Sequence, residues 1–187
     1  MDREFLYIAL LFSVFNIIGA WRPFYFAFDK VEHTKNVQTI GFLNCSFIRT
    51  KRNTETFCMN ANLVRDMIKP QLDVLIIVEG SQNEKLEVAN ITNMDFCSFL
   101  EGKGAFKIME LWRNELMRSS NVPKKCPLKK GTVLNVNKFN INPDNFPPYV
   151  PEAGLRLQAI LKERSVVLLT LNIHGVVKYK KSSRMRG

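Results

Sequence analysis

The sequence predicts a mainly β protein, an antiparallel sandwich of two sheets with one inserted amphipathic helix. Several segments alternate apolar and polar residues with the period of two that half-buried strands show. One segment instead repeats apolar residues at helical spacing, and polar or proline-rich stretches separate the segments. Seven or eight short strands and one helix fit a two-sheet sandwich.

The clearest strand patterns lie between Pro70 and Gly80 and in two segments near the C-terminus. The two C-terminal segments are separated by a polar turn over 162–165, and together they predict a hairpin. The apolar residues that share a face are Leu72, Val74, Ile76 and Val78 in the first segment, Leu155, Leu157, Ala159 and Leu161 in the second, and Val167, Leu169, Leu171 and Ile173 in the third.

The segment 104–119 breaks the strand pattern. Phe106, Met109, Trp112 and Leu116 recur at helical spacing, which predicts an amphipathic helix. The ordinary interpretation of this aromatic stripe is core packing, and the alternative is a role in admitting a ligand.

The stretch 140–154 holds four prolines, which prevent a regular ladder of strand hydrogen bonds. We expect an extended loop that crosses between two strands of one domain. No internal repeat or low-complexity tract is visible in the sequence.

The N-terminus predicts a removable leader. Residues 5–20 are an apolar run that ends in a small pair before Trp21. The run is shorter than the about 20 residues that a membrane span needs, but it suits a signal peptide. An uncleaved anchor or a buried helix is the alternative. We expect a signal peptide over 1–20, a single domain over 21–187, no stable membrane span and an extracellular location.

The first cysteine pair brackets a predicted hairpin. The segments 41–50 and 54–60 alternate like strands around a polar turn. With the turn centred just after Lys51, position 45 lies opposite position 58. Facing residues of antiparallel strands have Cα atoms about 4.5–5.5 Å apart, within disulfide reach. We therefore expect a Cys45–Cys58 bridge, whose closure removes chain entropy worth about 3 kcal/mol.

The second cysteine pair brackets the predicted helix, because Cys97 precedes it and Cys126 follows it. A Cys97–Cys126 bridge would fasten both ends of the helix to the sheet. An even cysteine count behind a secretory leader favours disulfides. The alternative is a zinc site, but the cysteines lack short metal-ligand spacing and the chain has two histidines.

Two sequons and the charge bear on partners. Asn44 and Asn90 begin Asn-x-Ser/Thr sequences, which predict glycosylation in the secretory pathway. The net charge is +10, and lysines crowd the segment 124–130. Such a surface attracts anionic partners such as phospholipid head groups or acidic glycans. The leader argues against nucleic acid.

No catalytic centre is expected. Acyl chemistry needs a base beside a nucleophile. The sequence has no G-x-S-x-G motif, and the cysteines are assigned to disulfides. His174 lies in a predicted strand without an evident acidic partner, and His33 lies in a polar segment. We expect neither an enzyme nor a cofactor, although a secreted hydrolase is the third functional class considered.

Several motifs resemble one large protein family. They are NCSF followed by FCMNANL, then ITNMDFCSFL, then ELWRNELMRSSNVPKKCPLKKG, and finally FPPYVPEAGLRL. This succession resembles insect secreted proteins of unknown function, including the CheB-like chemosensory group. The resemblance spans about residues 30–180, and its most specific parts are Asp95-Phe96-Cys97 and Cys126-Pro127.

That family is considered similar to the ML lipid-recognition domain. The resemblance implies an immunoglobulin-like sandwich with an apolar cavity between its sheets, and a role in carrying lipids or sensing hydrophobic chemical cues. It transfers no ligand contact residue by residue. The short spacing of some ML cysteine pairs is absent here, because Cys97 and Cys126 enclose a whole helix. The shape of the cavity entrance is therefore not implied.

The expected function is binding or presentation of a lipid or another hydrophobic ligand outside the cell, with an extracellular receptor as a further candidate partner. The alternative is a secreted protein-binding module or receptor accessory with a closed core. Lys124, Lys125, Lys129 and Lys130 are candidates for contact with an anionic head group. The candidate lining residues, each of which is also a plausible core residue, are Val74, Ile76, Phe106, Met109, Trp112, Leu157, Leu169 and Leu171.

Overall fold

The computed structural model describes residues 24–49, 55–80, 84–103, 107–146 and 150–179. The predicted leader, residues 1–20, lies outside this part of the chain. The elements are β1 (Phe24–Lys35), β2 (Ile40–Arg49), β3 (Glu55–Leu63), β4 (Gln71–Glu79), β5 (Lys85–Asp95), α2 (Phe96–Glu101), α3 (Lys107–Ser119), β6 (Val133–Phe139), the 3-10 helix η1 (Pro143–Asn145), β7 (Ala153–Glu163) and β8 (Val166–Tyr179).

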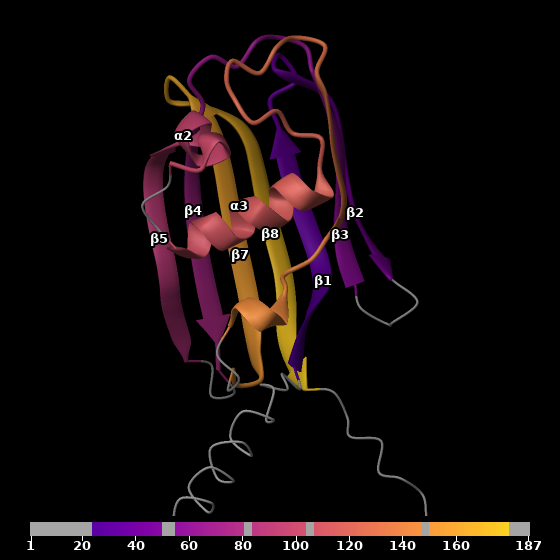
Figure 1. The fold of residues 1–187 in the computed structure, drawn as a ribbon, viewed down its shortest axis with the longest axis vertical. Helices are drawn as coiled ribbons and strands as arrows, with labels where there is room; N and C mark the ends of the chain where they lie inside the picture. Colours follow the sequence, from indigo (N-terminus) through magenta and orange to yellow (C-terminus); the bar gives the residue numbers. More distant parts are fainter. Residues whose placement is uncertain (1–23, 50–54, 81–83, 104–106, 147–149, 180–187) are drawn as a thin grey trace, which may run out of the picture.

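The strands form two antiparallel sheets, which confirms the predicted β-sandwich. One sheet has five strands in the order β1-β8-β7-β4-β5, and the other has three in the order β2-β3-β6. The predicted inserted helix is also confirmed as α3. Figure 1 shows α3 crossing the face of the five-stranded sheet, beside the three-stranded sheet. The layer opposite the large sheet is therefore part strand and part helix.

The strands with the clearest sequence pattern form the centre of the large sheet. β4 begins after Pro70 and ends before Gly80, as the sequence predicts. β7 and β8 form the predicted hairpin, and β7 lies between β8 and β4. The turn of this hairpin is Arg164-Ser165, with φ angles of 49° and 66°. Both residues are left-handed, as a tight two-residue hairpin turn requires.

The predicted Cys45–Cys58 disulfide is wrong. Cys45 faces Met59, and Cys58 faces Ser46. The pairing is thus displaced by one residue from the predicted register. Because side chains alternate across a strand, a one-residue shift sends the two sulfur atoms to opposite faces of the sheet. Both cysteines are free thiols in the structure.

The second predicted disulfide is present. Cys97 in α2 bonds to Cys126, with an S–S distance of 2.09 Å and Cα atoms 5.5 Å apart. α2 itself was not predicted from the sequence. Asp95 caps its first turn by accepting a hydrogen bond from the backbone N–H of Ser98, at 3.0 Å. Gly102 ends it with φ 79°, and a Cβ at this position would lie 3.1 Å from the Arg113 guanidinium carbon.

The interior has two different regions. Near the start of β1, a cluster of aromatic rings joins the two sheets, and we call it the phenylalanine cluster; its members are Phe24, Phe26, Phe28, Phe47 and Phe57. Towards the other end of the strands, aliphatic residues and methionines from both sheets pack with α2 and α3. The candidate site lies in this second region.

Candidate functional site

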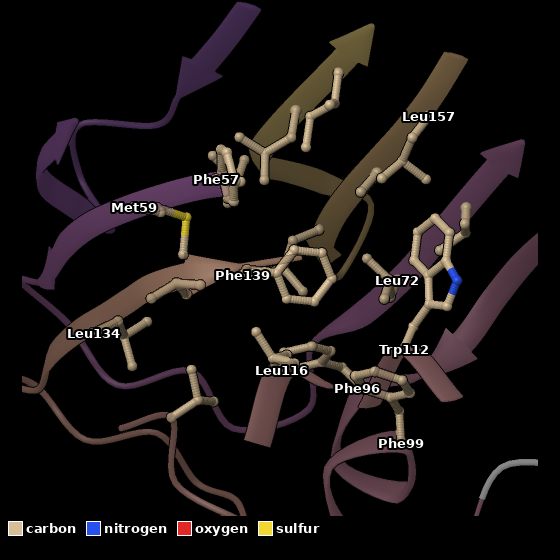
Figure 2. Close-up of a pocket in the computed structure, with 18 of the residues that line it drawn as sticks. Phe57, Met59, Leu72, Phe96, Phe99, Trp112, Leu116, Leu134, Phe139 and Leu157 are labelled. Atoms are coloured by element: carbon tan, nitrogen blue, oxygen red, sulfur yellow. The ribbon is translucent and has the colours of Figure 1, made fainter. Parts of the chain in front are cut away.

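A cavity of about 200 Å³ lies between the large sheet and the opposite layer. Figure 2 shows its walls, with Phe57, Met59 and Leu157 above, Leu116, Phe96 and Phe99 below, and Trp112 at the side. Every residue that lines it is apolar. The lining is Phe57, Met59, Met67, Leu72, Val74, Phe96, Phe99, Met109, Trp112, Leu116, Val122, Leu128, Leu134, Val136, Phe139, Leu157, Ala159, Leu161, Leu169, Leu171 and Ile173.

The first wall is the inner face of the three central strands of the large sheet. Leu157 and Ala159 on β7 and Leu169 and Leu171 on β8 line the cavity, yet each keeps accessible surface. Central-strand residues that face a packed layer are normally fully buried, because stacked sheets interdigitate at about 10 Å. These side chains face open space instead. Ala159 enlarges that space further, because it places a single methyl group where its neighbours place leucines.

The second wall is α3, as the helical stripe predicts. Met109, Trp112 and Leu116 line the cavity, whereas Lys107 and Glu110 are exposed on the other side of the helix. The spacings of three and four residues place the three apolar side chains on one face. The helix is also attached to α2, because the Arg113 side chain donates a hydrogen bond from Nε to the carbonyl oxygen of Leu100, at 2.9 Å.

The indole nitrogen of Trp112 is the one side-chain nitrogen or oxygen atom among the lining residues. Its Nε1 is buried and has no hydrogen-bond partner among the residues that the structure describes. Figure 2 places the indole at the side of the cavity, with the nitrogen on the ring edge turned away from Phe139. The ring surface that meets the cavity is therefore carbon.

The third wall is the three-stranded sheet, where an irregularity shapes the lining. Between Phe57 and Met59 the β3–β6 register shifts, so that Cys58 alone faces Asn137 and Lys138. Lys138 has a φ of 57° and donates its backbone N–H to the Cys58 sulfur at 3.4 Å. This bulge adds a residue to β6.

The bulge decides which β6 side chains reach the cavity. Leu134, Val136 and Phe139 all line it, although strict alternation from Val136 would select position 138. The extra residue carries the large ring of Phe139 inwards and leaves Lys138 exposed. The sequence has no glycine at this bulge, and its one turn-type residue there is Asn137, beside Lys138.

The disulfide holds the end of the cavity that is farther from the phenylalanine cluster. Phe96 and Phe99 of α2 line the cavity on either side of Cys97. On the other side of the bridge, Leu128 lines it and exchanges backbone hydrogen bonds of 2.9 Å with Met67. The bridge therefore joins two segments of the lining that the chain separates by the whole of α3.

Six of the eight predicted lining residues are at the cavity. They are Val74, Met109, Trp112, Leu157, Leu169 and Leu171. Ile76 does not line it but is buried in the adjoining core, with 3% of its surface exposed. Phe106 lies outside the described residues. The sequence patterns did not identify the lining residues of β3, β6, α2 and the 120–128 segment, nor Met67. Alternation on β3 is visible in the sequence, whereas which face turns inwards is set by packing.

In the described part of the chain, no ionisable side chain is among the cavity-lining residues. Cys45 packs against both the phenylalanine cluster and the aliphatic core beside it. Burial raises the pKa of its thiol to about 11. It is therefore a protonated, unreactive thiol at neutral pH. His33 is exposed, and His174 lies on the outer face of the large sheet, away from the cavity lining. Within the described ranges, no group of three or more His, Cys, Asp or Glu side chains is placed to hold a metal ion.

Both predicted glycosylation asparagines are exposed on edge strands. Asn44 lies on β2 and Asn90 on β5, each at the outer edge of its sheet. Glycosylation of both asparagines stays a prediction.

Residues 72–157 match a family described as "Protein of unknown function (DUF1091)". The matched stretch runs from β4 into β7, so it contains α2, the disulfide, α3 and β6, which form most of the cavity wall opposite the sheet. No curated protein matches the chain. In the described part of the chain, none of the helices has the length and apolar character to cross a membrane.

Proposed function

We propose that this protein is a secreted, non-enzymatic binder of a lipid or another hydrophobic ligand, and that the ligand occupies the cavity between the sheets. The observation that carries this proposal is a cavity of about 200 Å³ with an entirely apolar lining. An apolar cavity of about 150 Å³ stays dry and accepts a small hydrophobic molecule. The cavity of this protein is larger, and it has room for the hydrocarbon part of a ligand.

The energetics favour an aliphatic chain or ring. Each methylene that leaves water for such a cavity gains about 0.8 kcal/mol, before the cost of ordering the ligand. A polar group inside the cavity would lose its hydrogen bonds to water and find no replacement in the lining. We therefore expect the hydrocarbon part of the ligand to lie inside and any polar group to lie outside.

The secreted location is part of the proposal. The Cys97–Cys126 bridge is compatible with an oxidising compartment, where structural disulfides persist. The resemblance to the ML domain and to the insect chemosensory group gives the proposal its biological setting, in which the protein carries or presents a hydrophobic cue to a receptor. A chemosensory role rests on that resemblance alone.

Extraction of the native protein tests the proposal directly. Protein purified from several expression hosts is extracted with organic solvent, and the extract is analysed by mass spectrometry. A hydrophobic compound in amounts approaching one per chain supports the proposal. Empty extracts, together with no uptake of added fatty acids, would instead favour the alternative of a protein-binding module or receptor accessory.

A fluorescence titration tests whether the cavity is the binding place. In a Trp21→Phe background, Trp112 is the remaining tryptophan and lies in the cavity wall. Ala159→Phe fills the cavity and should weaken binding of an added fatty acid by at least about tenfold, or about 1.4 kcal/mol. Gln158→Phe is the matched control, because position 158 belongs to the same strand but faces outwards.

A further inference from the structure

We propose that one end of the sandwich docks onto the surface of an anionic lipid bilayer. This end, which we call the loop end, is formed by the segments 36–39, 64–70, 96–103, 120–132 and 164–165. Figure 1 shows these connections together at one end of the strands, opposite the start of β1 and the end of β8. The proposal concerns the outer surface of the molecule and does not require a loaded cavity.

Hydrogen bonds fix the loops of this end to one another. The backbone N–H of Asn36 donates to the carbonyl oxygen of Leu168, at 2.9 Å. The carboxylate of Glu163 accepts hydrogen bonds from the backbone N–H groups of Ile68 and Lys69, at 2.7 and 3.0 Å. Glu163 is only 9% exposed, so these bonds are shielded from water. The 64–70 segment and the β7–β8 hairpin therefore form one surface.

Aliphatic side chains project from this surface into solvent. Val37 is 69% exposed and Ile68 is 54% exposed, and Val166 and Val167 are each 47% exposed. Val166 and Val167 are neighbours in the chain and directly follow the hairpin turn, where both side chains are exposed. Isolated exposed aliphatic residues are ordinary, but four at the tips of linked loops form a patch that indicates an interaction site.

Cationic side chains surround the aliphatic tips. Three basic residues of this end are paired with acidic ones: Arg65 with Glu163, Lys103 with Glu101 and Lys129 with Asp66. Five more have no acidic partner within ion-pair distance in the part of the chain that the structure describes, and the loop end therefore carries an excess of positive charge. These five are Lys69, Lys124, Lys125, Lys130 and Arg164, all of them exposed.

An anionic bilayer fits this combination better than an acidic polysaccharide or an acidic protein loop. Each lysine or arginine near an anionic membrane contributes attraction, and aliphatic side chains gain by entering the apolar layer below the head groups. A polysaccharide would satisfy the cations but would leave Val37 and Ile68 in water. The patch therefore selects a partner that has a charged surface with an apolar interior.

At the loop end, exposed residues directly follow two residues of the cavity lining. Met67 lines the cavity, and the next residue, Ile68, is exposed. Leu128 lines it beside Lys129 and Lys130, which are exposed. If the proposed function holds, docking at this end would bring the lining within one residue of the membrane surface.

Vesicle flotation tests the proposal. The full secreted chain is mixed with vesicles of phosphatidylcholine alone or of phosphatidylcholine with phosphatidylserine. We expect flotation with the anionic vesicles only, and we expect it to weaken as salt is raised, because surface charges are screened. Lys124→Glu/Lys125→Glu and Ile68→Ser/Val166→Ser should each lower the partition coefficient by at least about tenfold.

Matched controls come from the rest of the surface. Leu86→Ser/Val88→Ser changes two aliphatic residues of comparable exposure on the edge strand β5, and Lys85→Glu/Lys178→Glu reverses two charges away from the loop end. Both controls should float as the unchanged protein does. Equal losses in control and test variants, or binding to heparin beads without binding to anionic vesicles, would overturn the proposal.

The outcome is independent of the cavity. The loop-end variants should still take up a fatty acid, as followed by Trp112 fluorescence. Ala159→Phe should lose that uptake and still float with anionic vesicles. The experiments therefore test ligand binding in the cavity and membrane docking of the loop end separately, so that one proposal can fail while the other holds.

Discussion

The two ends of the sandwich interior are held together in different ways. In the phenylalanine cluster the sheets meet directly, since the rings of Phe28 on β1 and Phe47 on β2 stack with centroids 5.7 Å apart and planes at 12°. Phe47 also contacts its cross-strand partner Phe57, at 5.9 Å. In the cavity region no strand of the small sheet covers β4, and α2, α3 and a disulfide take that place.

Close approach in the phenylalanine cluster extends to the backbone. A Cβ added at Gly175 would lie 2.7 Å from the carbonyl oxygen of Ala27 and 3.2 Å from the ring of Phe28. There is thus no room for a side chain at that point, whereas Ala159, farther along the same sheet, faces a cavity. The comparison teaches that packed aromatic rings hold the two layers together at one end, whereas a covalent bond fastens the layer opposite the large sheet at the end that encloses a cavity.

The largest expected effect comes from removing a ring of the phenylalanine cluster. Phe28→Ala should lower the free energy of unfolding by about 3–5 kcal/mol, because the side chain is 4% exposed and its loss leaves a void between the sheets. Phe139→Ala should cost clearly less, because Phe139 already faces a cavity on one side. Urea denaturation of both variants measures the difference, and equal losses would contradict the comparison.

The second effect is loss of the disulfide. Cys97→Ser/Cys126→Ser opens a bridge between residues 29 apart, which should lower the free energy of unfolding by about 3 to 4 kcal/mol. Amide hydrogen exchange should rise in α2 and α3 more than in β1, since the bridge fastens only the cavity region. A uniform rise over the whole sandwich would show that the two regions unfold as one unit.

The third expected effect is a difference in thiol reactivity. Cys45 and Cys58 should resist alkylation in the folded protein, because Cys58 is buried and burial raises the pKa of the Cys45 thiol to about 11. After denaturation without reductant, mass spectrometry should count two alkylated cysteines per chain. A count of zero would mean that a Cys45–Cys58 bond forms after all and that the register of β2 and β3 differs.

The smallest expected effect is electrostatic and lies on the outer face of the large sheet. The Asp73 carboxylate lies 2.6 Å from the Lys162 ammonium and accepts the backbone N–H of Asn93 at 2.6 Å. Burial opposes ionisation here, but these two contacts outweigh it and lower the pKa of Asp73 below 3.8. The stabilisation is therefore complete above pH 3.8 and is lost as the pH falls through the lower, folded-state pKa.

Two variants isolate this pair. Asp73→Asn and Lys162→Met should each cost about 1 kcal/mol at neutral pH, because both partners are partly buried. The difference from the unchanged protein should shrink below pH 3.8, which urea denaturation at several pH values measures. Binding of a fatty acid should stay the same, because neither residue lines the cavity. A cost that persists in acid would mean that the pair acts through packing and not through charge.

Local patterns in the sequence predicted much of the fold. Alternation specified β4, β7 and β8, and the positions of Met109, Trp112 and Leu116 specified the inner face of α3. The spacing of Cys97 and Cys126 around that helix gave the correct disulfide. These signals are readable because each depends on the period of one element or on its immediate flanks.

The errors fall where two elements had to be aligned. A single-residue displacement of the β2–β3 pairing turned a plausible disulfide into two free thiols on opposite faces. Position 76 was expected at the cavity because it alternates with position 74, but only Val74 lines it, since the cavity does not extend along the whole strand. The local sequence pattern specifies neither the register between β2 and β3 nor the extent of the cavity.

By itself the sequence determined the strands, the amphipathic helix and the covalent bond that brackets that helix, because periodicity and chain spacing act within short distances of the chain. Only the tertiary structure decided that the sheets stay apart on one side. The cavity lies where α2, α3 and the small sheet together oppose the large sheet, and the bulge opposite Cys58 brings Phe139 into its wall. Both depend on how distant segments meet, which a single element cannot encode.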